Sequence, residues 1–189
     1  IQFVKLVRSL DQALGNLEKK NLIKAYFKNA LPLENDNTTK YLNKSQDQWS
    51  SLFWAIYFLS GEKLNRIFTS KLLKIFTIRK TSMPQWLFDE CYESVGDLAE
   101  TIAHLVWKKK EVNNDVSTSL HQKIQSFMEI KSADDEKKLN FLTKDFEDKN
   151  FYYIFTVCKM FTGGFRIGVS RLQVTQVISE ICGVDKELI

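Results

Sequence analysis

A connector rich in glycine and arginine joins two apolar helical segments near the end of the chain: Phe161-Thr162-Gly163-Gly164-Phe165-Arg166-Ile167-Gly168-Val169-Ser170-Arg171. Glycine lets a backbone turn sharply and approach a ligand closely. A helix that begins at the end of such a connector points free N–H groups outward, which suits an anion. The connector therefore has two interpretations: a contact with a nucleic-acid phosphate, or a plain helix–loop–helix corner with solvated arginines.

Helical periodicity extends outward from this connector over nearly the whole chain, because apolar residues recur at the i, i+3, i+4 and i+7 positions of an α-helix. The pattern predicts helices near residues 3–14, 22–30, 52–59, 71–76, 84–95, 98–106, 120–127, 134–146, 151–161 and 172–181. Residues 33–46 are polar and rich in asparagine, which indicates a surface loop or insertion. The chain has only 7 glycines and 2 prolines, few for a β-protein with many turns. We therefore predict an all-α fold.

Several residues have predicted structural roles in these helices. Ser70 and Asp97 are expected to cap the helices that follow them, so Asp97 is assigned to capping and not to acid–base chemistry. Gly183 is expected to end the last helix. Trp54 and Trp86 lie on apolar helical faces and are expected in the core.

Composition limits the class of protein. The 189 residues are 44% hydrophobic and 13% aromatic, which predicts one folded domain or two small lobes. The net charge of +4 permits a polyanionic partner but does not require one. Neither a signal peptide nor an apolar run of about 20 residues is visible, so we expect a cytoplasmic protein with no membrane contact.

The cysteines and histidines give little support to metal or thiol chemistry. Cys91, Cys158 and Cys182 lie in apolar helical segments and are expected to be buried, reduced thiols. Only two histidines and no Cys-x-x-Cys spacing occur, so no metal site is expected.

Two segments resemble each other inside the chain. Each ends an apolar helix with a hydroxyl residue and glycine, then continues through a basic residue to a helix that opens with Ser-Lys or Ser-Arg. The segments are Tyr57-Phe58-Leu59-Ser60-Gly61 with Lys63 and Ser70-Lys71, and Lys159-Met160-Phe161-Thr162-Gly163 with Arg166 and Ser170-Arg171. This similarity indicates two lobes with similar basic corners, or a chance likeness between two helix ends.

A family resemblance covers most of the chain, from about residue 3 to residue 185. The blocks that carry it are Lys19 with Leu22 and Phe27, Trp54 to Gly61, Met83-Pro84-Gln85-Trp86-Leu87-Phe88-Asp89-Glu90-Cys91-Tyr92, Val95-Gly96-Asp97-Leu98-Ala99-Glu100-Thr101, and Thr162-Gly163-Gly164-Phe165-Arg166-Ile167-Gly168-Val169-Ser170. Together and in this order they resemble the N-terminal helical domain of ATP-dependent DNA ligases, especially the bacterial kind.

The resemblance implies a two-lobed helical domain with corners like those of helix-hairpin-helix motifs. Such a domain grips nicked duplex DNA across the minor groove without sequence specificity, while an adenylation domain and an OB-fold domain close around the duplex. The family reaction uses ATP and Mg²⁺ and adenylates the lysine of a Lys-x-Asp-Gly motif. It serves DNA replication, repair and recombination.

The Lys-x-Asp-Gly motif does not occur in this chain, which ends at Ile189. We therefore expect residues 1–189 to be the DNA-binding portion of a larger ligase, without catalytic residues, cofactor or ligase activity of its own. The expected partners are nicked double-stranded DNA and the parent protein's own adenylation and OB-fold domains. The chain is expected to be a monomer located at the nucleoid.

The candidate DNA contacts combine glycines, which allow close approach, with cations that bind phosphate. They are Gly163, Gly164, Arg166, Gly168, Ser170 and Arg171 in the connector, Lys63 and Lys71 in the similar corner, and Lys19 in the first family block. Ser170 is expected to cap the helix that follows it. The run Lys108-Lys109-Lys110 fits either a solvated loop or a phosphate clamp.

The sequence leaves two other functions to consider. The first is a helical protein–protein scaffold without a DNA role, which the composition also allows. The second is a helix-hairpin-helix glycosylase, to which Ile181-Cys182-Gly183-Val184-Asp185 bears a faint resemblance. The glycosylase interpretation lacks the Leu-Pro-Gly start of that motif and a matching catalytic lysine.

Overall fold

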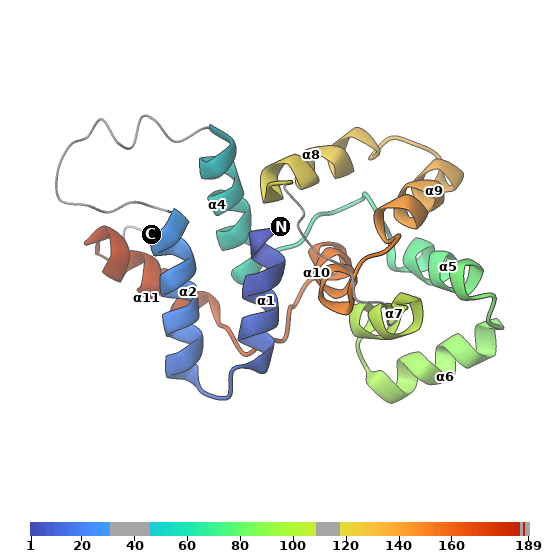
Figure 1. Cartoon of the computed structure of the whole chain (residues 1–189), viewed down its shortest axis with the longest axis horizontal. Helices are drawn as coiled ribbons and strands as arrows, with labels where there is room; N and C mark the ends of the chain where they lie inside the picture. The colour runs from blue at the N-terminus through green and yellow to red at the C-terminus, as the bar shows by residue number, and fades with distance from the viewer. Residues whose placement is uncertain (31–45, 109–117, 186, 188–189) are drawn as a thin grey trace. The chain divides into compact units, whose positions relative to one another are not determined.

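The computed structural model describes residues 1–30, 46–108, 118–185 and 187. These residues contain ten α-helices and no β-strand, which confirms the predicted all-α fold (Figure 1). The helices are α1 (Gln2–Gln12), α2 (Asn16–Ala30), α4 (Gln46–Leu59), α5 (Ser70–Thr81), α6 (Gln85–Val95), α7 (Leu98–Val106), α8 (Leu120–Glu129), α9 (Asp135–Asp145), α10 (Phe151–Thr162) and α11 (Arg171–Cys182). Of the loop predicted at 33–46, residues 33–45 lie outside the described part and Gln46 begins α4.

The chain divides into two compact units, in agreement with the predicted two lobes. Unit 1 comprises Ile1–Glu62, Ser117–Ile124 and Phe165–Ile189, and unit 2 comprises Lys63–Val116 and Gln125–Gly164. Unit 1 therefore contains α1, α2, α4 and α11, whereas unit 2 contains α5, α6, α7, α9 and α10. The boundary at Gly164 falls inside the glycine-rich connector.

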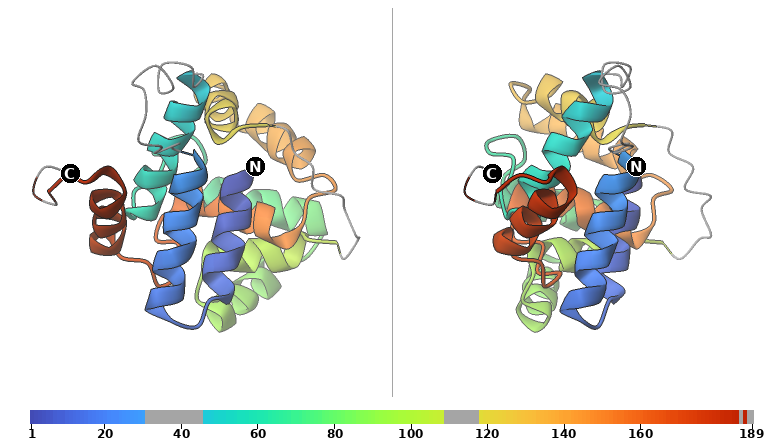
Figure 2. Two further views of the ribbon diagram at one scale, coloured as in Figure 1. Left: turned by 60° about the vertical axis from the view of Figure 1, so that its left-hand side comes forward. Right: turned by 90° about the vertical axis from the view of Figure 1, so that its left-hand side faces the viewer.

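Unit 1 is built around the antiparallel pair α1 and α2, with α4 and α11 packed against α2 (Figure 2). The rings of Phe3, Phe58 and Phe165 meet in its core, with centroids 5.9 to 6.4 Å apart. Phe165 belongs to the connector, so the unit's core anchors this segment at Phe165.

Unit 2 is centred on α10, which packs against α7 and α5. Nine consecutive residues of α10, from Tyr153 to Phe161, are buried. The rings of Phe68, Phe127 and Phe161 pack edge to face, with centroids 4.8 to 6.1 Å apart. The end of α10, from which the connector leaves, is therefore held in the core of unit 2.

The helix ends confirm the caps predicted at Asp97 and Gly183. Asp97 accepts a hydrogen bond from the Glu100 N–H (3.1 Å), and Gly183 ends α11 with φ 66°. Ser70, however, is the first helical residue of α5. The cap of α5 is instead Thr69, whose side chain accepts from the Leu72 N–H at 3.1 Å. Adjacent hydroxyl residues are equally suited to capping, so the sequence alone does not distinguish them.

Some predictions of burial were wrong. Trp86 is 66% exposed. It lies on α6, in which Phe88 is the only buried residue. The helix predicted near residues 3–14 ends at Gln12, and Leu14 beyond it is 99% exposed. Trp54 is half-buried.

The prediction of three buried cysteines was also wrong. Only Cys158 is buried, whereas Cys91 is half-buried and Cys182 is exposed at the end of α11; all three are free thiols. Burial raises the pKa of the Cys158 thiol, so that side chain stays protonated in its apolar surroundings.

Candidate nucleic-acid interface

The connector after α10 alternates between buried and exposed residues. Phe165 and Ile167 are buried, whereas Gly164, Arg166 and Gly168 are exposed. The same three exposed residues have positive φ angles of 54°, 54° and 66°. Left-handed backbone is accessible to glycine but costs other residues about 1 kcal/mol or more. The connector therefore buries its apolar side chains and holds Arg166 at the surface in a strained conformation, of the kind found at functional sites.

Several backbone donors of this segment are available for a ligand. The N–H groups of Gly164, Phe165 and Gly168 donate to no acceptor within the described part of the chain. Free amide donors beside left-handed residues are suited to anions such as phosphate.

Ser170 fixes the start of α11 at the end of the connector. Its Oγ accepts from the Gln173 N–H (3.2 Å), and the Gln173 Oε1 accepts from the Ser170 N–H (2.8 Å). This reciprocal capping box confirms the predicted cap. Arg171 is exposed in the first turn, where the positive end of the helix dipole adds to its charge.

Lys19 lies directly over Gly168 within unit 1. Its Nζ is 2.5 Å from the position that a Cβ atom on Gly168 would occupy. Only glycine leaves room for the ammonium group at this distance. The structure thus brings together Lys19, which begins the family blocks, and the connector, which ends them.

The next lysines of α2 are engaged elsewhere. Lys20 and Lys24 contact the carboxylate of Glu180 on α11, at 2.5 and 3.2 Å. Their hydrogen bonds lower the pKa of Glu180 below its usual value. Lys19 is therefore the lysine of α2 that the structure places against the connector, and Lys20 and Lys24 join α2 to α11.

Unit 2 has a second corner of similar conformation between α4 and α5. The segments that correspond are Asn65-Arg66-Ile67-Phe68-Thr69-Ser70-Lys71 and Phe165-Arg166-Ile167-Gly168-Val169-Ser170-Arg171. In each, an exposed arginine with positive φ (63° and 54°) precedes a buried isoleucine. Arg66 therefore matches Arg166. Sequence reasoning missed Arg66 because it aligned the two segments on glycine, which placed Lys63 opposite Arg166.

Lys63 and Lys71 are both exposed in unit 2. The side chain of Lys63 packs over Gly163, with Cδ 3.1 Å from the position of a Cβ atom on that glycine. Each unit thus gathers part of the predicted set: Lys19, Arg166, Gly168, Ser170 and Arg171 in unit 1, and Lys63, Lys71, Gly163 and Gly164 in unit 2.

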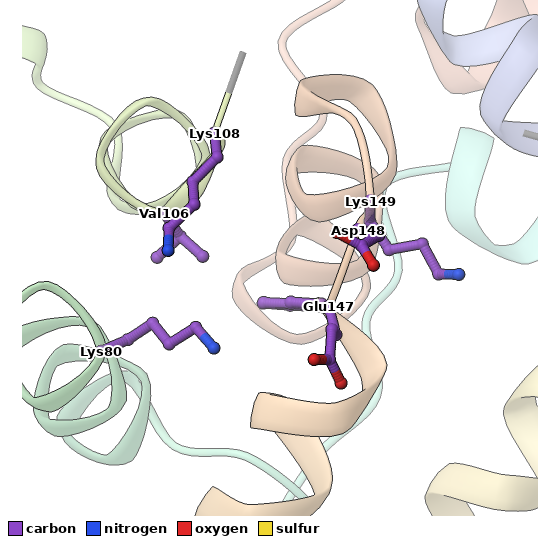
Figure 3. A pocket seen from close by; sticks show the side chains of 7 residues that line it. Lys80, Val106, Lys108, Glu147, Asp148 and Lys149 are labelled. Carbon is purple, nitrogen blue, oxygen red and sulfur yellow. The ribbon is translucent and has the colours of Figure 1, made fainter. Parts of the chain in front are cut away.

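A separate cleft in unit 2 contains Lys108. It is lined by Lys80, Val106, Lys108, Phe146, Glu147, Asp148 and Lys149 (Figure 3). Figure 3 shows Lys149 pointing away from Lys80 and Lys108, and Glu147 and Asp148 offset the positive charge. At about 200 Å³ the cleft is below the roughly 300–1,000 Å³ of typical small-molecule sites. Lys109 and Lys110 lie outside the described residues.

Comparison with known families places these features in a protein class. The family model described as DNA ligase N terminus matches residues 1–179. The chain belongs to this family. No curated protein matches it.

The family is the N-terminal domain of ATP-dependent DNA ligases, so this DNA ligase N-terminal domain has its place in such an enzyme. No group of His, Cys, Asp or Glu that could hold a metal ion occurs among its described residues. Within the same residues, no helix is long and apolar enough to cross a membrane.

Proposed function

We propose that the chain is the DNA-binding domain of an ATP-dependent DNA ligase and grips nicked duplex DNA without sequence preference. One arrangement carries the proposal: around Gly168, unit 1 gathers the Lys19 ammonium, the exposed Arg166 and the capped start of α11. Cations and free amide donors at an exposed backbone suit phosphates, which contact every sequence alike.

Each component of unit 1 has a distinct role in this proposal. The planar guanidinium of Arg166 offers paired donors to one phosphate. Gly168 has no side chain, which leaves room for the ammonium of Lys19 beside the exposed main chain, where a phosphate can approach it. Arg171 and the first turn of α11, fixed by Ser170, contact a neighbouring phosphate of the same strand.

The corner of unit 2 is proposed to contact the backbone in its own right, through Arg66, Lys63 and Lys71. Backbone contacts along the minor groove position the domain on the duplex without identifying bases. A paired substrate fits this mode, because no base has to leave the stack.

The chemistry of sealing is assigned to other parts of the ligase. The 189 residues contain no Lys-x-Asp-Gly motif. We propose that ATP and Mg²⁺ act in the adenylation and OB-fold domains of the parent protein. The chain itself is proposed to act as a monomer at the nucleoid, in replication, repair and recombination.

The test is duplex DNA binding by fluorescence anisotropy, with two unrelated sequences over a range of salt concentrations. The logarithm of the association constant should fall linearly with the logarithm of the salt concentration, with the same slope for both sequences. Binding that is insensitive to salt, or confined to one sequence, contradicts the proposal. The same preparation should neither seal nicks nor take up AMP, and adenylation would overturn the assignment of chemistry to other domains.

The alternative, a protein–protein scaffold, is favoured by one observation. A shallow apolar surface on α2 is lined by Gly15, Leu17, Leu22 and Ala25, and Leu17 is 72% exposed. Leu17→Ser and Lys19→Ala distinguish the two functions. If the chain binds DNA, Lys19→Ala should weaken DNA binding more than Leu17→Ser does. If the chain is a scaffold, it should not bind DNA, and Leu17→Ser should lose a protein partner.

A further inference from the structure

A buried lysine lies beneath the glycine-rich connector in unit 2. Lys159 belongs to the last turn of α10, and its side chain is only 3% exposed. The Nζ atom donates to Oδ2 of Asp97 and to the carbonyl oxygen of Gly164 (2.8 Å). It also lies 5.6 Å from the centre of the Phe155 ring. The buried charge therefore joins three elements: α10, the start of α7 and the connector.

Asp97 keeps this ammonium in a fixed place. Its Oδ1 accepts from the Glu100 N–H at 3.1 Å as the cap of α7, while Oδ2 binds Lys159. Since the carboxylate is tied to one helix and the lysine side chain extends from another, the ammonium cannot shift without breaking a cap or a buried ion pair. The carbonyl of Gly164 is thus held by a rigid donor.

Stability does not by itself account for this pair. Removing two charges from water offsets most of their mutual attraction, and apolar residues of similar volume often serve a core equally well. A hydrogen bond to the connector is something an apolar pair cannot provide. Gly164 needs such a restraint, because its φ is 54° and a Cβ atom there would meet nothing within 4 Å.

We propose that Lys159 is a positioning residue, which holds the Gly164 carbonyl inward so that the following peptide N–H faces the DNA backbone. In a trans peptide the C=O and N–H point in opposite directions. The N–H of Phe165 therefore points away from Lys159, and it has no acceptor among the described residues. This inference rests on the proposed DNA-binding function.

The experiment uses the double variant Lys159→Met/Asp97→Asn, which removes both charges without leaving either one buried alone. Asn at 97 retains an acceptor for the helix cap. The control is Tyr153→Phe in the same helix, which removes the partly buried hydrogen bonds from the Tyr153 hydroxyl to Asp145 (3.1 and 3.2 Å), away from the connector. The measurements are the amide NMR shifts of Gly163, Gly164 and Phe165, thermal unfolding, and the dissociation constant for duplex DNA.

The double variant should remain folded, shift these three amide resonances, and bind DNA about tenfold more weakly. Tyr153→Phe should leave the resonances and the affinity unchanged at a comparable loss of stability. Adding Arg166→Ala to the double variant should weaken binding by less than it does in the parent chain, because both changes act on one corner.

Unchanged amide resonances in the double variant would overturn the inference, whatever happens to DNA binding. The inference is also contradicted if the amide resonances shift but the affinity for DNA drops no further than in Tyr153→Phe. In both cases steep, salt-dependent binding by the parent chain would leave the proposed function standing. A parent chain that does not bind DNA at all would overturn both.

Discussion

At the scale of single residues, the left-handed positions of the connector combine strain with exposure. Phe165 and Ile167 anchor the segment in unit 1, and the residues on either side of Ile167 are turned outward as a result. Burial of two large apolar side chains contributes a few kcal/mol, about 1.5–3 for each, which exceeds the cost of one left-handed arginine. The conformation of Arg166 therefore follows from the packing of its neighbours.

Gly168→Ala is predicted to weaken DNA binding beyond its effect on stability. The new Cβ atom is strained at φ 66° and displaces the Lys19 ammonium. Gly183→Ala is a close control, because Gly183 in the same unit has the same φ and no atom near its Cβ position. Both variants should lose about 1 kcal/mol in urea unfolding. Equal DNA affinities for the two would show that Lys19 and Gly168 do not act together.

Arg66→Ala is predicted to weaken binding more than Lys63→Ala. Arg66 shares its backbone conformation with Arg166, whereas the stem of Lys63 packs on Gly163. The loss in Arg66→Ala should be equal for all sequences and should lower the salt slope by about one. A larger loss of affinity in Lys63→Ala would contradict this prediction. It would show that Lys63, and not Arg66, corresponds to Arg166, as an alignment of the two segments on glycine indicates.

At the scale of the helices, the caps decide where the two corners end. Ser170 and Gln173 satisfy each other's backbone donors at the start of α11. We predict that Ser170→Ala lowers the free energy of unfolding by about 1 kcal/mol, and that Thr69→Ala does so at α5. Ser70→Ala should have little effect, because Ser70 is already helical. Urea unfolding of the three variants tests this order, and a costly Ser70→Ala would contradict it.

The contact between α2 and α11 should depend on pH through Glu180. Lys20 and Lys24 lower the pKa of its carboxyl, so the folded state releases this proton more readily than the unfolded state. The stabilising contribution is therefore present above the usual glutamate pKa and is lost as the pH falls through the lowered value. An NMR titration should place the Glu180 midpoint below the usual value. Glu180→Gln should remove this part of the acid dependence, and a normal midpoint would contradict the prediction.

Most of the helices could be predicted from periodicity, because apolar spacing reports directly which face is buried. How much of each helix is buried could not be predicted, because burial depends on how the neighbouring helices pack against it. Trp86 lies on a correctly predicted helix whose only buried residue is Phe88. Ser170 was identified because the connector leaves one suitable cap, whereas Thr69 and Ser70 compete at α5.

The residues of the candidate site could be identified only in part, for a related reason. Arginine and glycine types were visible in the connector, but Arg66 is recognised by its positive φ, which no residue type reveals. A signal for it does exist: Arg-Ile stands at the same distance before Ser-Lys and Ser-Arg in the two corners. The position of Lys19 over Gly168 depends on how α2 packs beside the connector, and only the structure shows it.

At the scale of the whole molecule, net charge is a weak guide to function. The chain carries only +4, and two lysines of α2 are paired with Glu180. On the proposed function, affinity for DNA is therefore expected to come from the few cations placed beside free backbone donors, and not from a general attraction. The number of phosphates contacted sets how steeply affinity falls with salt concentration. Removing one contacting cation should therefore lower that slope by a measurable amount.

The most direct test compares Arg166→Ala with Lys108→Ala, with the folding of each variant checked by circular dichroism. Lys108 is also an exposed cation, but it lies in the cleft of unit 2 beside Glu147 and Asp148. The dissociation constant for duplex DNA is measured for both variants over a range of salt concentrations. We predict that Arg166→Ala weakens binding equally for all sequences and lowers the salt slope by about one, while Lys108→Ala changes little. A greater loss in Lys108→Ala would show that the connector is only a structural turn.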